Sequence, residues 1–176
     1  MTLSPRQINS HISRSKRCLE VLQLVCTHWE VFDAIHTSTA LHKTAQLMQH
    51  SDKQLIAQHP GYGILLTLTA AKASAFQPWA LSNILWALSQ LPQDHQHLDG
   101  LPETLTAGVS QQLPKFNSQQ LANSLWAMAH MGHNPGPRLL SAVATQATQL
   151  YDSMQVLGHL NDLAGTSLDP FIISTS

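Results

Sequence analysis

Two pairs of histidines are the first candidates for metal chemistry in this chain of 176 residues. His95 and His97 lie in a glutamine-rich turn, while His130 and His133 have a spacing that occurs in metal sites. A structural zinc ion needs four ligands, and neither pair has a cysteine or a carboxylate at zinc-binding spacing. We therefore expect incidental histidines, no bound metal and no other cofactor.

The two cysteines and the missing catalytic motifs argue against an enzyme. Cys18 and Cys26 cannot form a disulfide framework, so we expect buried free thiols in a reducing compartment. The sequence has no glycine-rich nucleotide loop, nucleophile elbow or paired-carboxylate segment. Because these residues supply no nucleophile, base and oxyanion site together, we do not expect catalysis.

The strongest pattern in the chain is an internal repeat. Phe32, Phe76 and Phe116, which are 44 and 40 residues apart, open the segments FDAIHTSTALHKTAQL, FQPWALSNILWALSQL and FNSQQLANSLWAMAHM. The second and third segments share further residues that we interpret as scaffold: Leu81 and Leu121, Asn83 and Asn123, Leu85 and Leu125, Trp86 and Trp126, Ala87 and Ala127. A repeat of this length is typical of a solenoid, in which each unit packs on the next.

Each phased segment predicts a helix, because its apolar residues recur at steps of three and four. We expect companion helices at about 62–76, 101–113 and 138–151, and an earlier helix running from Ser13 or Ser15 toward Trp29. The fold class is therefore all-α, an α-solenoid of stacked helix–turn–helix repeats. The expected divisions are a basic segment or first helix at 1–18, a degenerate first unit at 19–75, repeats at 76–115 and 116–154, and a helix end and tail at 155–176.

Apolar and small residues form three stripes along the phased helix at 100° per residue. Leucines form the first stripe, and Trp79 and Trp86, with Trp126 in the third unit, stand nearly opposite. We expect both stripes to be buried between neighbouring helices, which makes the tryptophans core residues. The third stripe, which includes Ser82 and Ser89, lets a neighbouring helix approach closely.

A fourth stripe is mostly polar and changes from unit to unit. Stacking would align it into one track, which suits the reading of one RNA base per repeat. The candidate RNA-binding residues on and beside it are Lys43, Gln46, Asn83, Gln90, Gln120, Asn123 and His130. The alternative for Asn83 and Asn123 is a hydrogen bond to a turn or a neighbouring backbone, with no ligand.

Composition and charge limit the partners. The chain is 43% hydrophobic and 11% charged, with a net charge of −1. This composition argues against disorder, and no apolar run is long enough to span a membrane. Residues 1–17 are basic, which resembles a transit peptide, but Lys115 and Arg138 are the only Lys or Arg after Phe76. Since phosphate contacts dominate RNA affinity, we expect the array to bind RNA weakly by itself.

The segments FQPWALSNILWALSQL and FNSQQLANSLWAMAHMGH resemble the first helix of octotricopeptide repeats, with their Leu-Ala-Asn-x-Leu-Trp-Ala core. The segment FDAIHTSTALHKTAQL looks like the degenerate unit ahead of such repeats in the FAST-kinase-like, RAP-domain family. It departs from the pattern at Thr39 and His42, no RAP domain follows the repeats, and no kinase motif is present.

This resemblance implies an α-solenoid that binds single-stranded RNA in a chloroplast or mitochondrion. It would act in transcript stability, processing, splicing or translation, without a membrane or DNA partner, and the chain would be a fragment or truncated relative of a longer factor. The alternative function is a non-enzymatic scaffold that docks to a larger repeat protein. A log–log salt slope of several would favour RNA binding, and no salt-sensitive retention of RNA would favour the scaffold.

Overall fold

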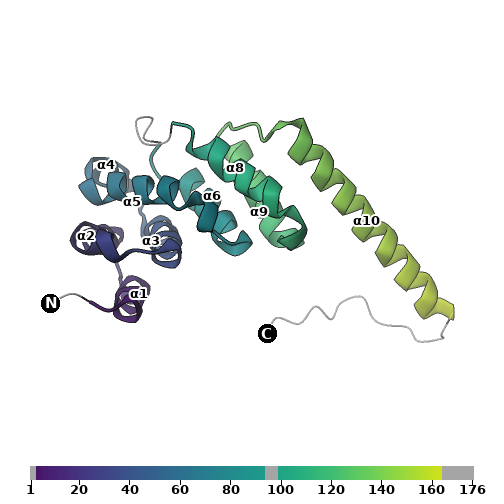
Figure 1. Ribbon diagram of the computed structural model, residues 1–176, viewed down its shortest axis with the longest axis horizontal. Helices are drawn as coiled ribbons and strands as arrows, with labels where there is room; N and C mark the ends of the chain where they lie inside the picture. The colour runs from purple at the N-terminus through teal and green to yellow at the C-terminus, as the bar shows by residue number, and fades with distance from the viewer. Residues whose placement is uncertain (1–2, 94–98, 164–176) are drawn as a thin grey trace. The chain divides into compact units, whose positions relative to one another are not determined.

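The computed structural model describes residues 3–93 and 99–163, and every regular element within these ranges is a helix (Figure 1). The chain divides into two compact units after Pro135. The second unit is described as the single helix α10 (Gly136–Leu163). The first unit holds all the other helices and is an α-solenoid, which confirms the expected fold class.

Three helices at the phase of the sequence repeat form one layer of this solenoid. They are α3 (Ala34–Leu47), α6 (Pro78–Gln90) and α9 (Ser118–His130). Helix α6 packs between α3 and α9, and α1 (Pro5–Arg14) packs on the other side of α3 (Figure 1). The polar stripes of consecutive repeats therefore lie on neighbouring helices.

A second set of helices covers the leucine side of this layer. Its members are α2 (Cys18–His28), α5 (Pro60–Ala71) and α8 (Leu101–Gln112), and each comes directly before a helix of the first layer. The short helix α4 (Lys53–Gln58) and the 3-10 turn His50–Asp52 account for the longer spacing of the first repeat. The chain thus alternates between the two layers as it runs through the unit.

The three phased phenylalanines have equivalent surroundings. Each follows a 3-10 turn (Trp29–Val31, Ala73–Ala75 and Leu113–Lys115) and is buried. Their backbone angles agree closely, with φ/ψ of −71°/124° at Phe32, −74°/133° at Phe76 and −77°/135° at Phe116. The repeat in the sequence is therefore a repeat in the backbone, and corresponding side chains form columns.

Three expected helix boundaries are wrong. The helix expected from Ser13 or Ser15 toward Trp29 is α2, which begins at Cys18, and the separate helix α1 precedes it with Ser4 as its N-cap residue. Ser15 follows the end of α1, and its hydroxyl donates to the His11 carbonyl oxygen at 2.9 Å. The other two errors concern α5, which ends at Ala71 although a helix of 62–76 was expected, and α10, which extends to Leu163 although a helix of 138–151 was expected. Asn117 caps α9, since its side chain accepts from the Gln120 amide.

Small side chains let the helices of the first layer approach each other. Ser82 is buried, and its hydroxyl donates to the main-chain oxygen of Gln120 on α9 at 3.1 Å. Ser38 and Ala45, at the corresponding positions of α3, are buried too, whereas Ala122 and Ala129 of α9 are exposed. The expected stripe of small residues therefore mediates close packing in the first two repeats.

Candidate functional site

Helix α6 is buried on every side except one. Nine of its residues are buried, and the remaining four follow a single stripe: Trp79, Asn83, Trp86 and Gln90. The corresponding residues of α3 and α9 are also half-buried or exposed. We call these twelve positions the amide–indole face: Ile35, Thr39, His42 and Gln46; Trp79, Asn83, Trp86 and Gln90; Gln119, Asn123, Trp126 and His130. This face is the side of the layer that the second set of helices leaves uncovered.

Five of the seven candidate residues lie on this face. Gln46, Asn123 and His130 are exposed, and Asn83 and Gln90 are half-buried. Four members of the expected polar stripe that were not candidates are buried: His36, Ala80, Ala87 and Ala127. The open surface therefore lies slightly to one side of the expected stripe. On α6 it includes Trp79 and Trp86 instead of Ala80 and Ala87.

The two remaining candidates lie beside the face, and one of them has a structural task. Gln120 is half-buried, and its side-chain oxygen accepts from the Asn117 amide at 3.1 Å. Asn117 in turn accepts from the Gln120 amide at 2.8 Å, which makes a capping box at the start of α9. Lys43 is half-buried on α3. Gln120 therefore supports α9, and it is a poor choice for testing ligand contacts.

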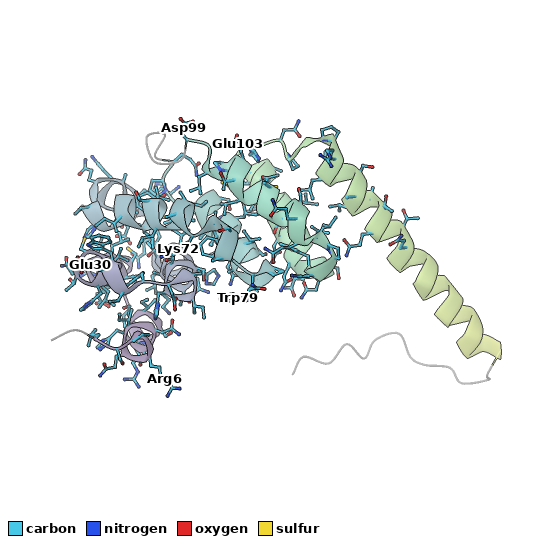
Figure 2. All side chains as sticks on the ribbon, viewed as in Figure 1. Arg6, Glu30, Lys72, Trp79, Asp99 and Glu103 are labelled. Carbon is cyan, nitrogen blue, oxygen red and sulfur yellow. The ribbon has the colours of Figure 1, made fainter. Side chains whose placement is uncertain are left out.

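The tryptophans were expected in the core, and that expectation is wrong for two of them. Trp79 is 41% exposed and Trp126 is 52% exposed. Figure 2 shows Trp79 below α6, away from α4 and α5. The second layer covers only the leucine side, so a residue opposite the leucines faces solvent. The sequence could have placed the tryptophans beside the polar candidates. Trp79 lies four residues before Asn83 and Trp86 lies three residues after it, which puts all three on one side of the helix.

Aromatic rings meet at two places on the face. His42 of α3 packs against Trp86 of α6, with ring centroids 5.1 Å apart at 53°. Trp126 stacks almost parallel on His130 of the same helix, at 4.9 Å and 10°. Burial, with a smaller effect of the Lys43 charge, lowers the pKa of His42. The imidazole against Trp86 is therefore neutral at neutral pH.

The amide–indole face is nearly free of charge. Helices α6 and α9 contain no Lys, Arg, Asp or Glu, and α3 contains only Lys43. Lys72 and Lys115 come before the phenylalanines that precede α6 and α9, and Lys53 follows the end of α3. Figure 2 labels Lys72. Such a surface can stack on flat groups and form hydrogen bonds, with few ion pairs to phosphate.

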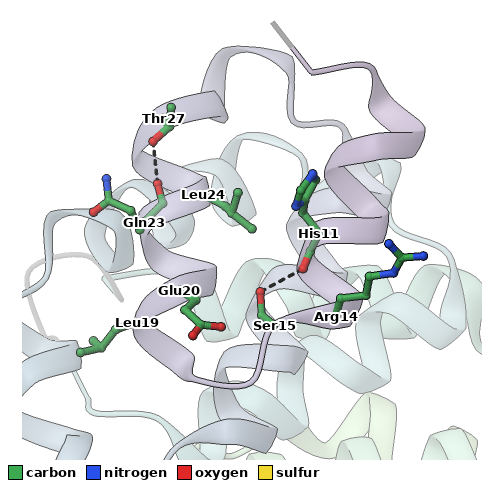
Figure 3. A pocket seen from close by; sticks show the side chains of 8 residues that line it. All are labelled: His11, Arg14, Ser15, Leu19, Glu20, Gln23, Leu24 and Thr27. Carbon is green, nitrogen blue, oxygen red and sulfur yellow. Dashed lines mark hydrogen bonds between the residues drawn. The ribbon is translucent and has the colours of Figure 1, made fainter. Parts of the chain in front are cut away.

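Two open grooves elsewhere in the first unit do not continue this face. One, of about 570 Å³, lies between α1 and α2, and its lining includes His11, Arg14 and Glu20 (Figure 3). In this groove the Ser15 hydroxyl donates to the His11 carbonyl oxygen of α1, and the Thr27 hydroxyl donates to the Gln23 carbonyl oxygen of α2. The other, of about 600 Å³, is largely apolar and is lined by Trp29 and parts of α4 and α5: Ala57, Gln58, His59, Pro60, Gly63, Ile64, Thr67 and Leu68. Neither groove brings together the residues of a catalytic site.

The histidines singled out for metal chemistry have other surroundings. Nε2 of His133 lies 2.9 Å from the Thr106 hydroxyl, and Nδ1 lies 3.6 Å from a Glu103 oxygen, so this ring connects the end of α9 to α8. His95 and His97 lie outside the described residues. Within the described ranges, no three His, Cys, Asp or Glu side chains are grouped to hold a metal ion, and no helix has the length and hydropathy of a membrane span.

Comparison with known proteins gives one informative similarity. Over 121 residues the chain is 27% identical to a RAP domain-containing protein, chloroplastic, of Oryza sativa subsp. japonica. The alignment covers 66% of this chain and 19% of the rice protein, so the chain spans a small part of that relative. No family model matches the chain, and no solved structure matches it. The chain is thus distantly related to a chloroplast protein with a RAP domain, in agreement with the resemblance of its repeats to that family.

Proposed function

We propose that this chain binds single-stranded RNA along the amide–indole face and acts, without catalysis, in RNA processing, stability or translation in the chloroplast. One observation carries the proposal. In α6, a helix packed on both sides, every residue that escapes burial is an amide or an indole. Amide groups read base edges and aromatic rings stack on bases, which is how proteins recognise single-stranded RNA.

The alignment of the repeats supports a strand-like ligand. Asn83 and Asn123 occupy the same position of two helices that pack side by side. Gln90 and His130 also share a position, about two helical turns further along these helices. A ligand crossing from α6 to α9 would therefore meet an asparagine on each helix. The chloroplast assignment rests on the rice relative, whose name states that it is chloroplastic, and on the octotricopeptide-like repeats.

The test compares two double variants with the unchanged chain. Asn123→Ala with His130→Ala removes two exposed polar groups from the face without touching the capping box. The matched control, Gln111→Ala with His50→Ala, removes an exposed amide and an exposed imidazole that lie outside α3, α6 and α9. Fluorescence anisotropy with a labelled single-stranded RNA should show affinity lowered about tenfold by the first pair, since each lost hydrogen bond costs about 0.5–1.5 kcal/mol.

Circular dichroism accompanies each titration, because loss of helicity would show that the face residues are needed for folding. Equal affinity of both double variants, with helicity intact, would contradict the proposal. If the unchanged chain binds no RNA at all, the scaffold function becomes the better account of the face.

The structure also revises the expected salt dependence. Lys43 is the only Lys or Arg within the three helices of the face, and Lys72 and Lys115 precede two of these helices, so we expect one to three lysine contacts with a bound strand. For single strands the log–log slope is about −0.7 per phosphate contact, which gives a slope of about −1 to −2. The steeper slope expected from the sequence would place the RNA on another surface, such as the basic N-terminal segment.

A further inference from the structure

Trp79 and Trp126 expose much of their indole rings at positions where the repeat accepts other residues. Ile35 of α3 and Gln119 of α9 occupy the position of Trp79, and both are exposed. His42 of α3 and Trp86 of α6 occupy the position of Trp126, and these two half-buried rings pack against each other. The packing of the layer therefore does not require tryptophan at the position of Trp79, and Trp126, unlike Trp86, leaves about half of its side chain exposed. A large exposed aromatic side chain of this kind is a candidate for ligand contact.

Each of these indoles has a carboxamide one helical turn away on the same side. Asn83 follows Trp79 by four residues, and Asn123 precedes Trp126 by three. The indole offers a flat apolar surface, and the carboxamide offers a hydrogen-bond donor and an acceptor. A nucleobase has the complementary parts, a flat face and a hydrogen-bonding edge.

One of the two indoles is already stacked on a neighbouring ring in the free protein. Trp126 lies parallel to the His130 ring at 4.9 Å, which covers part of one indole face, yet the side chain remains 52% exposed. A ring held in this way loses little conformational freedom when a ligand stacks on it. Because α6 and α9 carry no charged residue, the ligand suited to these positions is flat and uncharged where it touches them.

We propose that Trp79 and Trp126 each stack on one nucleobase of single-stranded RNA, while Asn83 and Asn123 form hydrogen bonds with the base edges. The inference rests on the proposed function and adds the mode of contact, which is through base faces rather than phosphates. Helices α6 and α9 pack side by side, so a single strand can cross both tryptophans.

Single substitutions to leucine test the stacking. Trp79→Leu and Trp126→Leu keep an apolar side chain but remove the aromatic plate. Trp29→Leu is the matched control, because Trp29 is 45% exposed and lies in the 3-10 turn after α2, outside the face. With an oligouridine of about ten nucleotides, each face variant should bind roughly 5- to 100-fold more weakly. The control should keep the affinity of the unchanged chain, and all three should keep their helicity.

An abasic oligomer separates base contacts from phosphate contacts. It has the same number of phosphates and riboses as the oligouridine but no bases, so stacking predicts that it does not bind measurably. Binding of the abasic oligomer with unchanged affinity would overturn the inference, since the bases would then contribute nothing.

The remaining outcomes distinguish this inference from the proposed function. If both leucine variants bind like the unchanged chain but the Asn123/His130 double variant does not, RNA binding holds and stacking is refuted. If the unchanged chain binds neither oligomer, both proposals fail. If sedimentation shows self-association that Trp79→Leu or Trp126→Leu abolishes, the indoles contact protein, and the inference is again overturned.

Discussion

The hydroxyl of Ser82 on α6 donates a hydrogen bond to the main-chain oxygen of Gln120 on α9 over 3.1 Å. A side chain this short reaches the next backbone only when the two helices lie very close together. The accepting oxygen belongs to the first turn of α9, so the bond also limits how α9 is shifted along α6. In this way one buried serine helps to set the relative positions of Asn83 and Asn123 on the amide–indole face.

Replacing Ser82 by leucine should force α6 and α9 apart. We expect Ser82→Leu to lower the free energy of unfolding by about 1–3 kcal/mol, the usual effect of overpacking a close contact. Ser82→Ala should cost less, about 0.5–1.5 kcal/mol, because it removes only the hydrogen bond. Urea denaturation followed by circular dichroism measures both. Ser74→Leu, at an exposed position of the 3-10 turn, is the control, and equal effects of the two leucines would contradict the role of Ser82.

Two glycines in the second layer should respond oppositely to alanine. A Cβ on Gly61 would collide with the main-chain oxygen of Leu22 and would lie 3.1 Å from the Cys26 sulfur, because α5 crosses α2 there. A Cβ on Gly108 would meet only the Leu81 methyl groups, at 3.4 Å. We expect Gly61→Ala to lower the free energy of unfolding by about 1–3 kcal/mol. We expect Gly108→Ala to raise it by up to about 1 kcal/mol, because alanine favours the helix more than glycine does. Thermal and urea unfolding of both variants under the same conditions measure these changes, and a change of the same sign in both variants would contradict the prediction.

The sequence was sufficient for the fold because each repeat shows its own pattern. The phenylalanine phase, the leucine stripe and the small residues Ser82 and Ser89 each predict a packing contact, and the structure contains a solenoid with these residues buried. The face could not be derived in the same way. Periodicity shows that Trp79 and Trp126 lie opposite the leucines, but not whether a third layer covers them. The number of layers is a property of the whole unit, and no single helix encodes it.

Acidification should weaken the contact between α3 and α6. Burial lowers the pKa of His42 in the folded state, so the unfolded chain binds the proton first as the pH falls. The contribution of neutral His42 to stability is therefore present above the usual histidine pKa of about 6.5 and is lost as the pH falls through the lower folded value. His42→Phe keeps a ring against Trp86 but cannot titrate, so its unfolding midpoint should fall less between about pH 7.5 and about pH 5.5. An equal fall in both proteins would show that other groups control the acid response.

The two cysteines should differ in reactivity toward iodoacetamide. Cys18 is buried, and its sulfur lies 3.4 Å from an Asp52 carboxylate oxygen, whereas Cys26 is only half-buried. Burial, followed by the hydrogen bond and the negative charge of Asp52, raises the pKa of the Cys18 thiol, so less reactive thiolate is present at a given pH. Peptide mapping of the alkylated protein should show Cys26 modified first and Cys18 modified mainly at higher pH. Asp52→Asn removes the charge while keeping an amide of similar size, and it should speed the labelling of Cys18 without changing that of Cys26. If Asp52→Asn accelerates both sites together, the turn at His50–Asp52 has opened, and the carboxylate protects Cys18 by holding structure instead of by its charge.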